Sequence, residues 1–145
     1  MKRIFIKIIS RFFLFPAWFM PMSSLRRFFH ILRGVKIGKG TYIGYFVIID
    51  HNYPDNILIG EGGCIASRCF ITSHDESYFF SLGKKQKMAK VKIGNNVMIG
   101  TGCVVLPGII IGEKSIIGAN SVVNKNIPAN YLAAGSPAKP IKKLK

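Results

Sequence analysis

The stretch that decides the fold is residues 93–128, which read IGNNVMIGTGCVVLPGIIIGEKSIIGANSVVNKNIP. An aliphatic residue followed by a small or polar one returns there every six positions, as in Ile93-Gly94 and Ile99-Gly100. A period of six fits neither a helix of 3.6 residues per turn nor a long strand with alternating faces. It fits short strands that are separated by turns and wound into a solenoid.

The same period extends toward the N-terminus. Twelve hexads occur in three blocks, and their aliphatic positions are Ile37, Ile43, Ile49, Ile59, Ile65, Ile71, Ile93, Ile99, Val105, Ile111, Ile117 and Val123. The fifth place of most hexads is small or β-branched, and Cys69 and Cys103 fall in this second column. We predict that both columns fill the interior of an all-β solenoid, which makes these two cysteines core residues.

Length and composition indicate one folded unit with a basic surface. The chain has 145 residues, nearly half of them apolar, which excludes a disordered chain. Its 21 Lys and Arg against 6 Asp and Glu give a formal charge of +15, which should attract anions. Three cysteines without C-x-x-C spacing, and no cleavable signal pattern, argue against a disulfide framework. We therefore expect a reduced, cytoplasmic protein.

Residues 1–33 form a separate segment in which aromatic and basic residues alternate. Lys7 and Arg11 lie inside its apolar run, and Pro16 and Pro21 interrupt it, so a spanning helix is not expected. The sequence predicts two short helices that pack on the first coil of the solenoid. The alternative is shallow attachment to an anionic membrane surface, at the inner face of the membrane, because this composition also suits interfacial segments.

Three segments of the chain resemble the hexapeptide-repeat acyltransferases, a family that includes maltose, galactoside, and capsular or O-antigen sugar O-acetyltransferases. Residues 71–75, ITSHD, resemble the active-site segment of these enzymes. Residues 99–128 and residues 134–142, AGSPAKPIK, resemble their coenzyme A segments. The resemblance implies acetyl-coenzyme A as acyl donor and a hydroxyl of a sugar or polysaccharide precursor as acceptor.

The resemblance also implies the architecture, a left-handed parallel β-helix with three hexads per coil and therefore about four coils. We expect this β-helix over residues 34–128, with a loop insertion at 77–92, and Pro128 ends it. A short helical segment, 1–33, precedes it, and a basic tail that binds coenzyme A follows at 129–145. The family implies a homotrimer, and the insertion is long enough to reach a neighbouring chain.

His74 is the predicted general base. It occupies the fourth place of its hexad, directly before the insertion, which places it at a corner beside a loop. An imidazole can remove the proton of a sugar hydroxyl as the hydroxyl attacks a thioester. The register places Asn52 one coil below His74, where the family holds the acceptor. Asp50 either orients the imidazole or binds the turn at Tyr53-Pro54, and Asp75 is a further candidate for orienting it.

The donor site is predicted from the resemblance alone. The thioester is expected near the backbone of Gly100 and Thr101, whose N–H groups can receive the developing oxyanion. The pantetheine arm is expected to pass the small residues Ala66 and Ala119. The remaining matches to the coenzyme A segments are Asn124, Lys125, Lys139 and Lys142. The two lysines of the tail are expected to bind phosphate as point charges.

Two other classes of function fit the sequence less well. A carbonic-anhydrase-like hydratase needs three histidines on a zinc ion, but Phe79 stands where a second histidine is required and His30 lies outside the repeat. No metal is therefore predicted. A nucleic-acid-binding module needs aromatics interleaved with its charges, whereas Phe and Trp concentrate in the N-terminal segment. The sequence leaves the acceptor sugar and the acyl length open.

Overall fold

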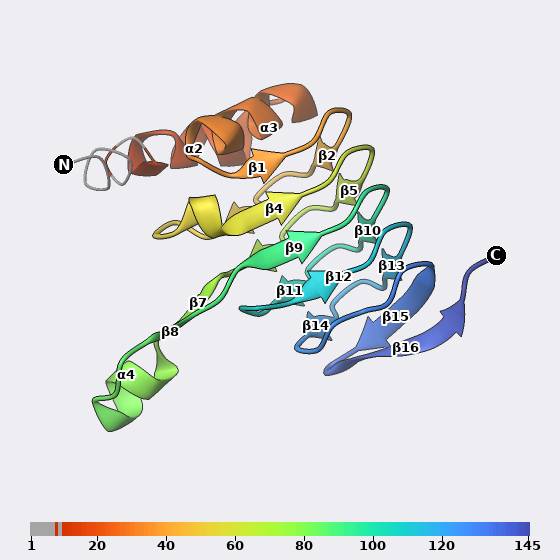
Figure 1. Cartoon of the computed structure of the whole chain (residues 1–145). Coiled ribbons are helices and arrows are strands. Elements are labelled where there is room, and N and C mark those ends of the chain that lie inside the picture. The colour runs from red at the N-terminus through yellow and green to blue at the C-terminus, as the bar shows by residue number, and fades with distance from the viewer. Residues whose placement is uncertain (1–7, 9) are drawn as a thin grey trace.

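A computed structural model describes residue 8 and residues 10–145 of the chain. Three stacks of short parallel strands form the three faces of a prism (Figure 1). The first face contains β1 (Lys36–Ile37), β4 (Ile57–Ile59), β9 (Val91–Ile93) and β12 (Ile110–Ile111). The second contains β2 (Tyr42–Ile43), β5 (Cys64–Ile65), β10 (Met98–Ile99), β13 (Ile116–Ile117), β15 (Tyr131–Gly135) and β16 (Ala138–Lys143). The third contains β3 (Ile48–Ile49), β6 (Phe70–Ile71), β11 (Val104–Val105) and β14 (Val122–Val123).

The hexads stack in register from coil to coil. On the second face Ile43 pairs with Ile65 and Ile65 with Ile99, and the other faces repeat this arrangement. The aliphatic column is buried except at Ile37, which is half-buried, and in the small column Cys69 and Cys103 are fully buried. The predicted fold is confirmed, because three parallel sheets in this register are consistent with a left-handed β-helix.

Corners between faces require small residues where adjacent coils approach closely. A Cβ atom added to Gly100 would lie 2.6 Å from the backbone nitrogen of Ala119 and 2.8 Å from its Cα. Glycine is therefore the residue that the coil spacing allows at this corner.

The chain continues the solenoid past Pro128, where the sequence predicted its end. Ile127 bridges Ile111 on the first face, and β15 then pairs in parallel with β13 on the second. Pro128 lies at a corner, where a missing N–H removes no ladder bond. Strand β16 turns back antiparallel to β15 and ends the stack. The basic tail is thus a β-hairpin at the C-terminal end of the prism.

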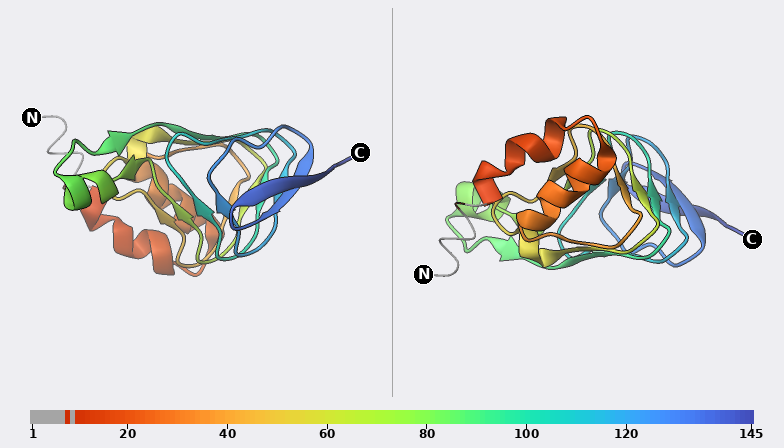
Figure 2. Two further views of the ribbon diagram at one scale, coloured as in Figure 1. Left: turned by 90° about the horizontal axis from the view of Figure 1, so that it is seen from below. Right: turned by 90° about the horizontal axis from the view of Figure 1, so that it is seen from above.

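Two helices, α2 (Leu14–Phe19) and α3 (Ser23–Leu32), cover the other end (Figures 1 and 2). We call the described part of residues 8–33 the cap. In the strand ladders an N–H donates to a carbonyl of the next coil, as from Gly44 N to Ile65 O, so the carbonyls of Ile43 and Ile49, which face away from the second coil, need other donors. Arginines of the cap supply the missing donors, because Arg26 Nε donates to Ile43 O (2.9 Å) and Arg33 Nη2 to Ile49 O (2.9 Å).

The helices predicted within residues 1–33 are therefore present and pack on the first coil, although the part of the prediction on residues 1–7 and 9 lies outside the described residues. Among the described helices, none combines the length and the apolar character that a membrane span requires.

Both insertions leave the prism at the corner between the third and first faces. The first forms a short 3-10 helix, η1 (Pro54–Asn56). The second forms an arm in which β7 (His74–Asp75) pairs antiparallel with β8 (Lys87–Met88), with α4 (Ser77–Leu82) at its tip. Figure 1 shows this arm projecting from the prism. Because His74 is the first residue of β7, the arm begins at the predicted catalytic residue.

Candidate active site

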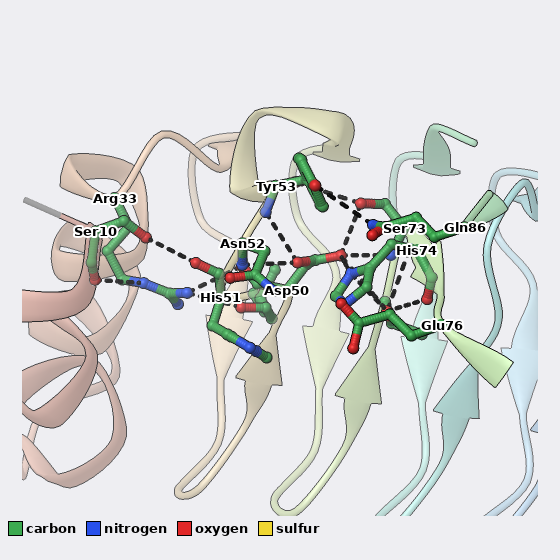
Figure 3. A network of polar contacts seen from close by, with 12 residues as sticks. Ser10, Arg33, Asp50, His51, Asn52, Tyr53, Ser73, His74, Glu76 and Gln86 are labelled. Atoms are coloured by element: carbon green, nitrogen blue, oxygen red, sulfur yellow. Dashed lines mark hydrogen bonds and ion pairs between the residues drawn. The ribbon is translucent and has the colours of Figure 1, made fainter. Parts of the chain in front are cut away.

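His74 and Asp50 meet on adjacent coils at the corner between the third and first faces, which we call the histidine edge. Asp50 directly follows β3, and Ile49 pairs with Ile71, so the turn after β6 lies one coil further along. His74 Nδ1 lies 2.6 Å from Asp50 Oδ2 (Figure 3). Two residues that are 24 positions apart in the sequence thus form a hydrogen-bonded pair.

Asp50 is buried and surrounded by hydrogen-bond donors. Its Oδ2 accepts from Ser73 N (2.8 Å) and Ser73 Oγ (2.7 Å), while Oδ1 accepts from Asn52 N (3.0 Å) and Tyr53 N (2.9 Å). Burial alone would raise the pKa of Asp50, but the hydrogen bonds from His74, Ser73 and Tyr53 outweigh it and lower the pKa below 3.8. Asp50 is therefore a carboxylate at neutral pH.

The ionised Asp50 determines the tautomer of His74. A carboxylate only accepts hydrogen bonds, so Nδ1 of His74 carries the proton and Nε2 keeps its lone pair in the neutral ring. Nε2 lies 3.9 Å from Glu76 Oε1, and the His74 side chain is 10% exposed. The rings of Tyr53 and His51 lie 5.4 and 5.9 Å from the His74 ring, between centroids. The site thus offers a proton acceptor whose orientation is fixed.

The two roles that the sequence left open for Asp50 occur together. One carboxylate oxygen binds the imidazole and the other binds the turn at Asn52 and Tyr53. Asp75, the other candidate for orienting the ring, accepts instead from Ser77 N (2.9 Å) at the start of α4.

Asn52 lies on the histidine edge one coil nearer the cap, half-buried, as its register places it (Figure 3).

The predicted donor residues lie on a different edge of the prism. Ala66, Gly100, Thr101 and Ala119 occupy successive coils at the corner between the second and third faces, which we call the small-residue edge. Ala66 N donates to Ile99 O (2.9 Å), Gly100 N to Ile117 O (2.8 Å) and Asn120 N to Thr101 O (2.8 Å). The whole third face separates this edge from the histidine edge. Within one chain, His74 and the Gly100-Thr101 backbone therefore do not meet.

The other predicted donor residues are divided between two places. Asn124 and Lys125 follow β14 at the histidine edge, two coils beyond His74. Lys139 and Lys142 are exposed on β16, opposite Ala134 and Leu132.

Comparison with known proteins identifies the repeat and the fold. The model of the bacterial transferase hexapeptide (six repeats) matches residues 90–125. A hexapeptide-repeat acetyltransferase from Vibrio cholerae O1 biovar eltor, complexed with acetyl coenzyme A, superimposes with a TM-score of 0.79 at 22% identity, over 97% of this chain and 87% of that chain. A galactoside acetyltransferase in complex with coenzyme A gives 0.68 at 25% identity, over 99% and 81%. The polySia-specific acetyltransferase NeuO gives 0.64 at 32% identity, over 75% of this chain and 51% of NeuO.

The chain carries the bacterial transferase hexapeptide repeat and shares its fold with these acetyltransferases. A search of curated protein sequences gave no match. Within residues 8 and 10–145, no three His, Cys, Asp or Glu side chains are grouped so that they could hold a metal ion.

Sequence reasoning missed several residues around the pair. Ser73 donates twice to Asp50, and Glu76 faces Nε2 of His74 from the start of the arm. The register signal was available for Ser73, because it lies one coil from His51 and next to His74. Glu76 had no such signal, because the arm departs from the six-residue period there.

The cap is connected to this site through Arg33. Its Nη2 donates to the carbonyl oxygen of Asp50 (3.0 Å) as well as to that of Ile49, and its Nη1 to Nδ1 of His30 (2.9 Å). Burial lowers the pKa of Arg33 to about 10, while the charge of Asp50 acts to raise it. Figure 3 shows Arg33 at one end of the hydrogen-bond network and His74 toward the other.

Proposed function

We propose that the protein transfers an acetyl group from acetyl-coenzyme A to a hydroxyl of a sugar or of a bacterial surface polysaccharide precursor, with His74 as general base. The observation that carries the proposal is the Asp50–His74 pair, whose geometry leaves Nε2 as a proton acceptor at the histidine edge. The relatives support the substrate classes, since one was solved with acetyl coenzyme A, one is a galactoside acetyltransferase, and NeuO is polySia-specific.

The reaction follows from the state of His74. Nε2 removes the proton of the acceptor hydroxyl while its oxygen attacks the thioester carbonyl, which gives a tetrahedral intermediate. When the intermediate collapses, the C–S bond breaks, and the imidazolium returns the proton to the sulfur of coenzyme A. The Asp50 carboxylate stabilises the imidazolium that forms in between. Asn52, beside this pair, is suited to bind a hydroxyl of the acceptor.

The developing oxyanion needs a donor that is not already used. Gly100 N–H donates to Ile117 O in the ladder, whereas among the described residues no backbone bond takes the N–H of Thr101. We therefore assign the oxyanion contact to Thr101 N–H, with Gly100 permitting the close approach of the coils.

The two edges are proposed to meet between chains of a homotrimer. A ring with threefold symmetry, formed by one repeated heterologous contact, can place the histidine edge of one chain against the small-residue edge of the next. Each site would then take His74 from one protomer and the Ala66, Thr101 and Ala119 edge from its partner. The arm that begins at His74 would form a further wall of the site.

Three lysines and Asn124, near the C-terminal end, are proposed to bind the phosphates of coenzyme A. Lys139 and Lys142 are exposed on β16, and Asn124 and Lys125 lie at the end of β14. Ammonium groups are ordinary partners for phosphate, although they lack the bidentate geometry of arginine.

A transfer assay tests the proposal. The purified protein is incubated with acetyl-coenzyme A and a panel of sugars, nucleotide sugars and polysaccharides, and release of coenzyme A is measured. At least one acceptor should be acetylated, and His74→Ala should lower turnover by ~10²- to 10⁴-fold, the usual contribution of a general base. A His74→Ala variant that keeps more than about a tenth of the turnover would exclude His74 as the base.

A further inference from the structure

The outer surface of the cap is apolar, and its inner surface is cationic. In α3 the buried side chains are Arg26 and His30, whereas Leu25, Phe28 and Ile31 are exposed by 37%, 51% and 39%. A helix on a water-soluble domain normally buries its apolar face. Here the polarity is reversed because the arginines satisfy carbonyls of the first coil, and so the apolar side chains point away from the prism.

The apolar surface continues along the rest of the cap. Phe12 and Phe15 are 78% and 68% exposed, and Phe19 and Met22 are 43% and 60% exposed. Phe15 and Phe19 lie in α2, which covers the same end of the prism as α3 (Figure 2, right). A contiguous patch of large apolar side chains on a protein surface marks a site of interaction.

Charge indicates what covers this surface. The first acidic residue of the chain is Asp50, so residues 1–49 contain nine Lys and Arg and no Asp or Glu. Arg11, Lys36 and Lys39 are exposed among them. A second copy of the chain would bring the same positive charge against the patch, whereas an anionic lipid bilayer offers an apolar layer below a negative surface.

We propose that the cap docks on an anionic membrane surface, with its aromatic side chains inserted shallowly and the prism standing on its N-terminal end. Phe side chains bury apolar area at the level of the headgroups, and the basic residues attract anionic lipid. If the protein is a trimer with parallel prisms, three caps face the same side, and their binding is multivalent. The proposal does not depend on the acetyl acceptor, because the cap and the histidine edge are separate surfaces.

Vesicle binding tests the proposal. The full-length protein is sedimented with vesicles of pure phosphatidylcholine and with vesicles of an equimolar mixture of phosphatidylcholine and phosphatidylglycerol. We expect stronger binding to the mixed vesicles, weakened but not abolished by salt, because salt screens charge and leaves apolar insertion. Trp18 is the only tryptophan of the chain and lies in α2. Its fluorescence should be quenched by lipids with brominated acyl chains.

A pair of matched variants locates the surface. Phe12→Gln with Phe15→Gln should weaken binding to the mixed vesicles by at least about tenfold, since two inserted rings are lost. Phe79→Gln with Phe80→Gln makes the same change on α4 of the arm, where the side chains are 54% and 76% exposed, and should bind like the wild type. Circular dichroism melting shows that both variants are folded.

Three results would overturn the proposal: no binding of the wild type to the mixed vesicles, equal binding of the Phe12 and Phe15 variant, or binding without quenching of Trp18. A drop in the solution mass of the Phe12 and Phe15 variant, with no vesicle binding by the wild type, would assign the patch to a second copy of the chain.

Discussion

At the scale of single residues, Asp50 connects the turn, the base and the cap. One carboxylate oxygen holds the turn, the other holds Nδ1 of His74, and the backbone carbonyl receives Arg33. A change at Asp50 therefore has separable effects on geometry and on charge. Asp50→Asn removes the negative charge and keeps one side-chain oxygen. Asp50→Ala removes the charge and both side-chain oxygens.

Asp50→Asn should lower kcat by ~10²- to 10⁴-fold while the protein stays folded. When the new amide turns its NH2 group toward Nδ1 of His74, the tautomer with the proton on Nε2 is favoured, so the base loses its lone pair. The NH2 group cannot accept from Ser73 N as Oδ2 did, which lowers the melting temperature as well. The oxygen of the same amide still accepts from the turn. Steady-state kinetics and thermal melting check this expectation. A kcat within about tenfold of the wild type would show that Asp50 does not orient the base.

At the scale of elements, the cap is held by buried cations around a neutral histidine. Burial, followed by the nearby charge of Arg33, lowers the pKa of His30 from 6.5 to about 3. Arg33 can only donate, so Nδ1 of His30 must accept, and a protonated ring would break this contact. The cap therefore depends on His30 staying uncharged.

Acidification below pH 6.5 should destabilise the cap. Between pH 6.5 and about 3 the unfolded chain binds a proton at His30 and the folded chain does not, so stability falls as pH falls through this window. The contribution of His30 is about 1.4 kcal/mol per pH unit. His30→Gln keeps an acceptor for Arg33 and removes the titration.

Urea unfolding of the wild type and His30→Gln between pH 6.5 and about 4.5 measures this difference, because His51 and His74 are common to both proteins. The pKa of Asp50 is lowered from 3.8, so its contribution is lost only at more acidic pH. The same pH slope in both proteins would contradict the prediction.

At the scale of the whole molecule, the six-residue period predicted a solenoid because each hexad places Ile or Val inward regardless of its distant neighbours, and the family resemblance supplied three hexads per coil. Together they predicted which residues share an edge, and hence that Asp50 and Asn52 lie near His74. The orientation of the cap could not be predicted this way. Arg26, His30 and Arg33 have the spacing of a polar helix face, which normally points to solvent. They point inward because Ile43 O and Ile49 O, at the end of the stack, have no neighbouring coil to donate to them. This end of the stack is a feature of the folded prism and leaves no pattern in the sequence.

The separation of the histidine edge from the small-residue edge leads to the prediction that a single chain is inactive. If sites form between chains, a trimer mixed from two different dead chains contains some sites built from two intact edges. His74→Ala removes the base from one edge, and Ala119→Trp places a bulky side chain on the other, at an exposed position. A substitution at Gly100 is unsuitable, because a Cβ there would press on the backbone of the next coil and disturb the fold.

Each variant alone should be inactive, and unfolding and refolding the two together should restore a fraction of the wild-type activity. Two matched controls are refolding of each variant by itself and simple mixing without refolding, both of which should remain inactive. A chain that carries both substitutions, refolded with wild type, shows how strongly dead edges reduce the activity of mixed trimers. If the co-refolded mixture stays inactive although mass measurement finds mixed trimers, or if the wild type is active as a monomer, then the base and the donor edge are brought together within one chain, and the shared site is excluded.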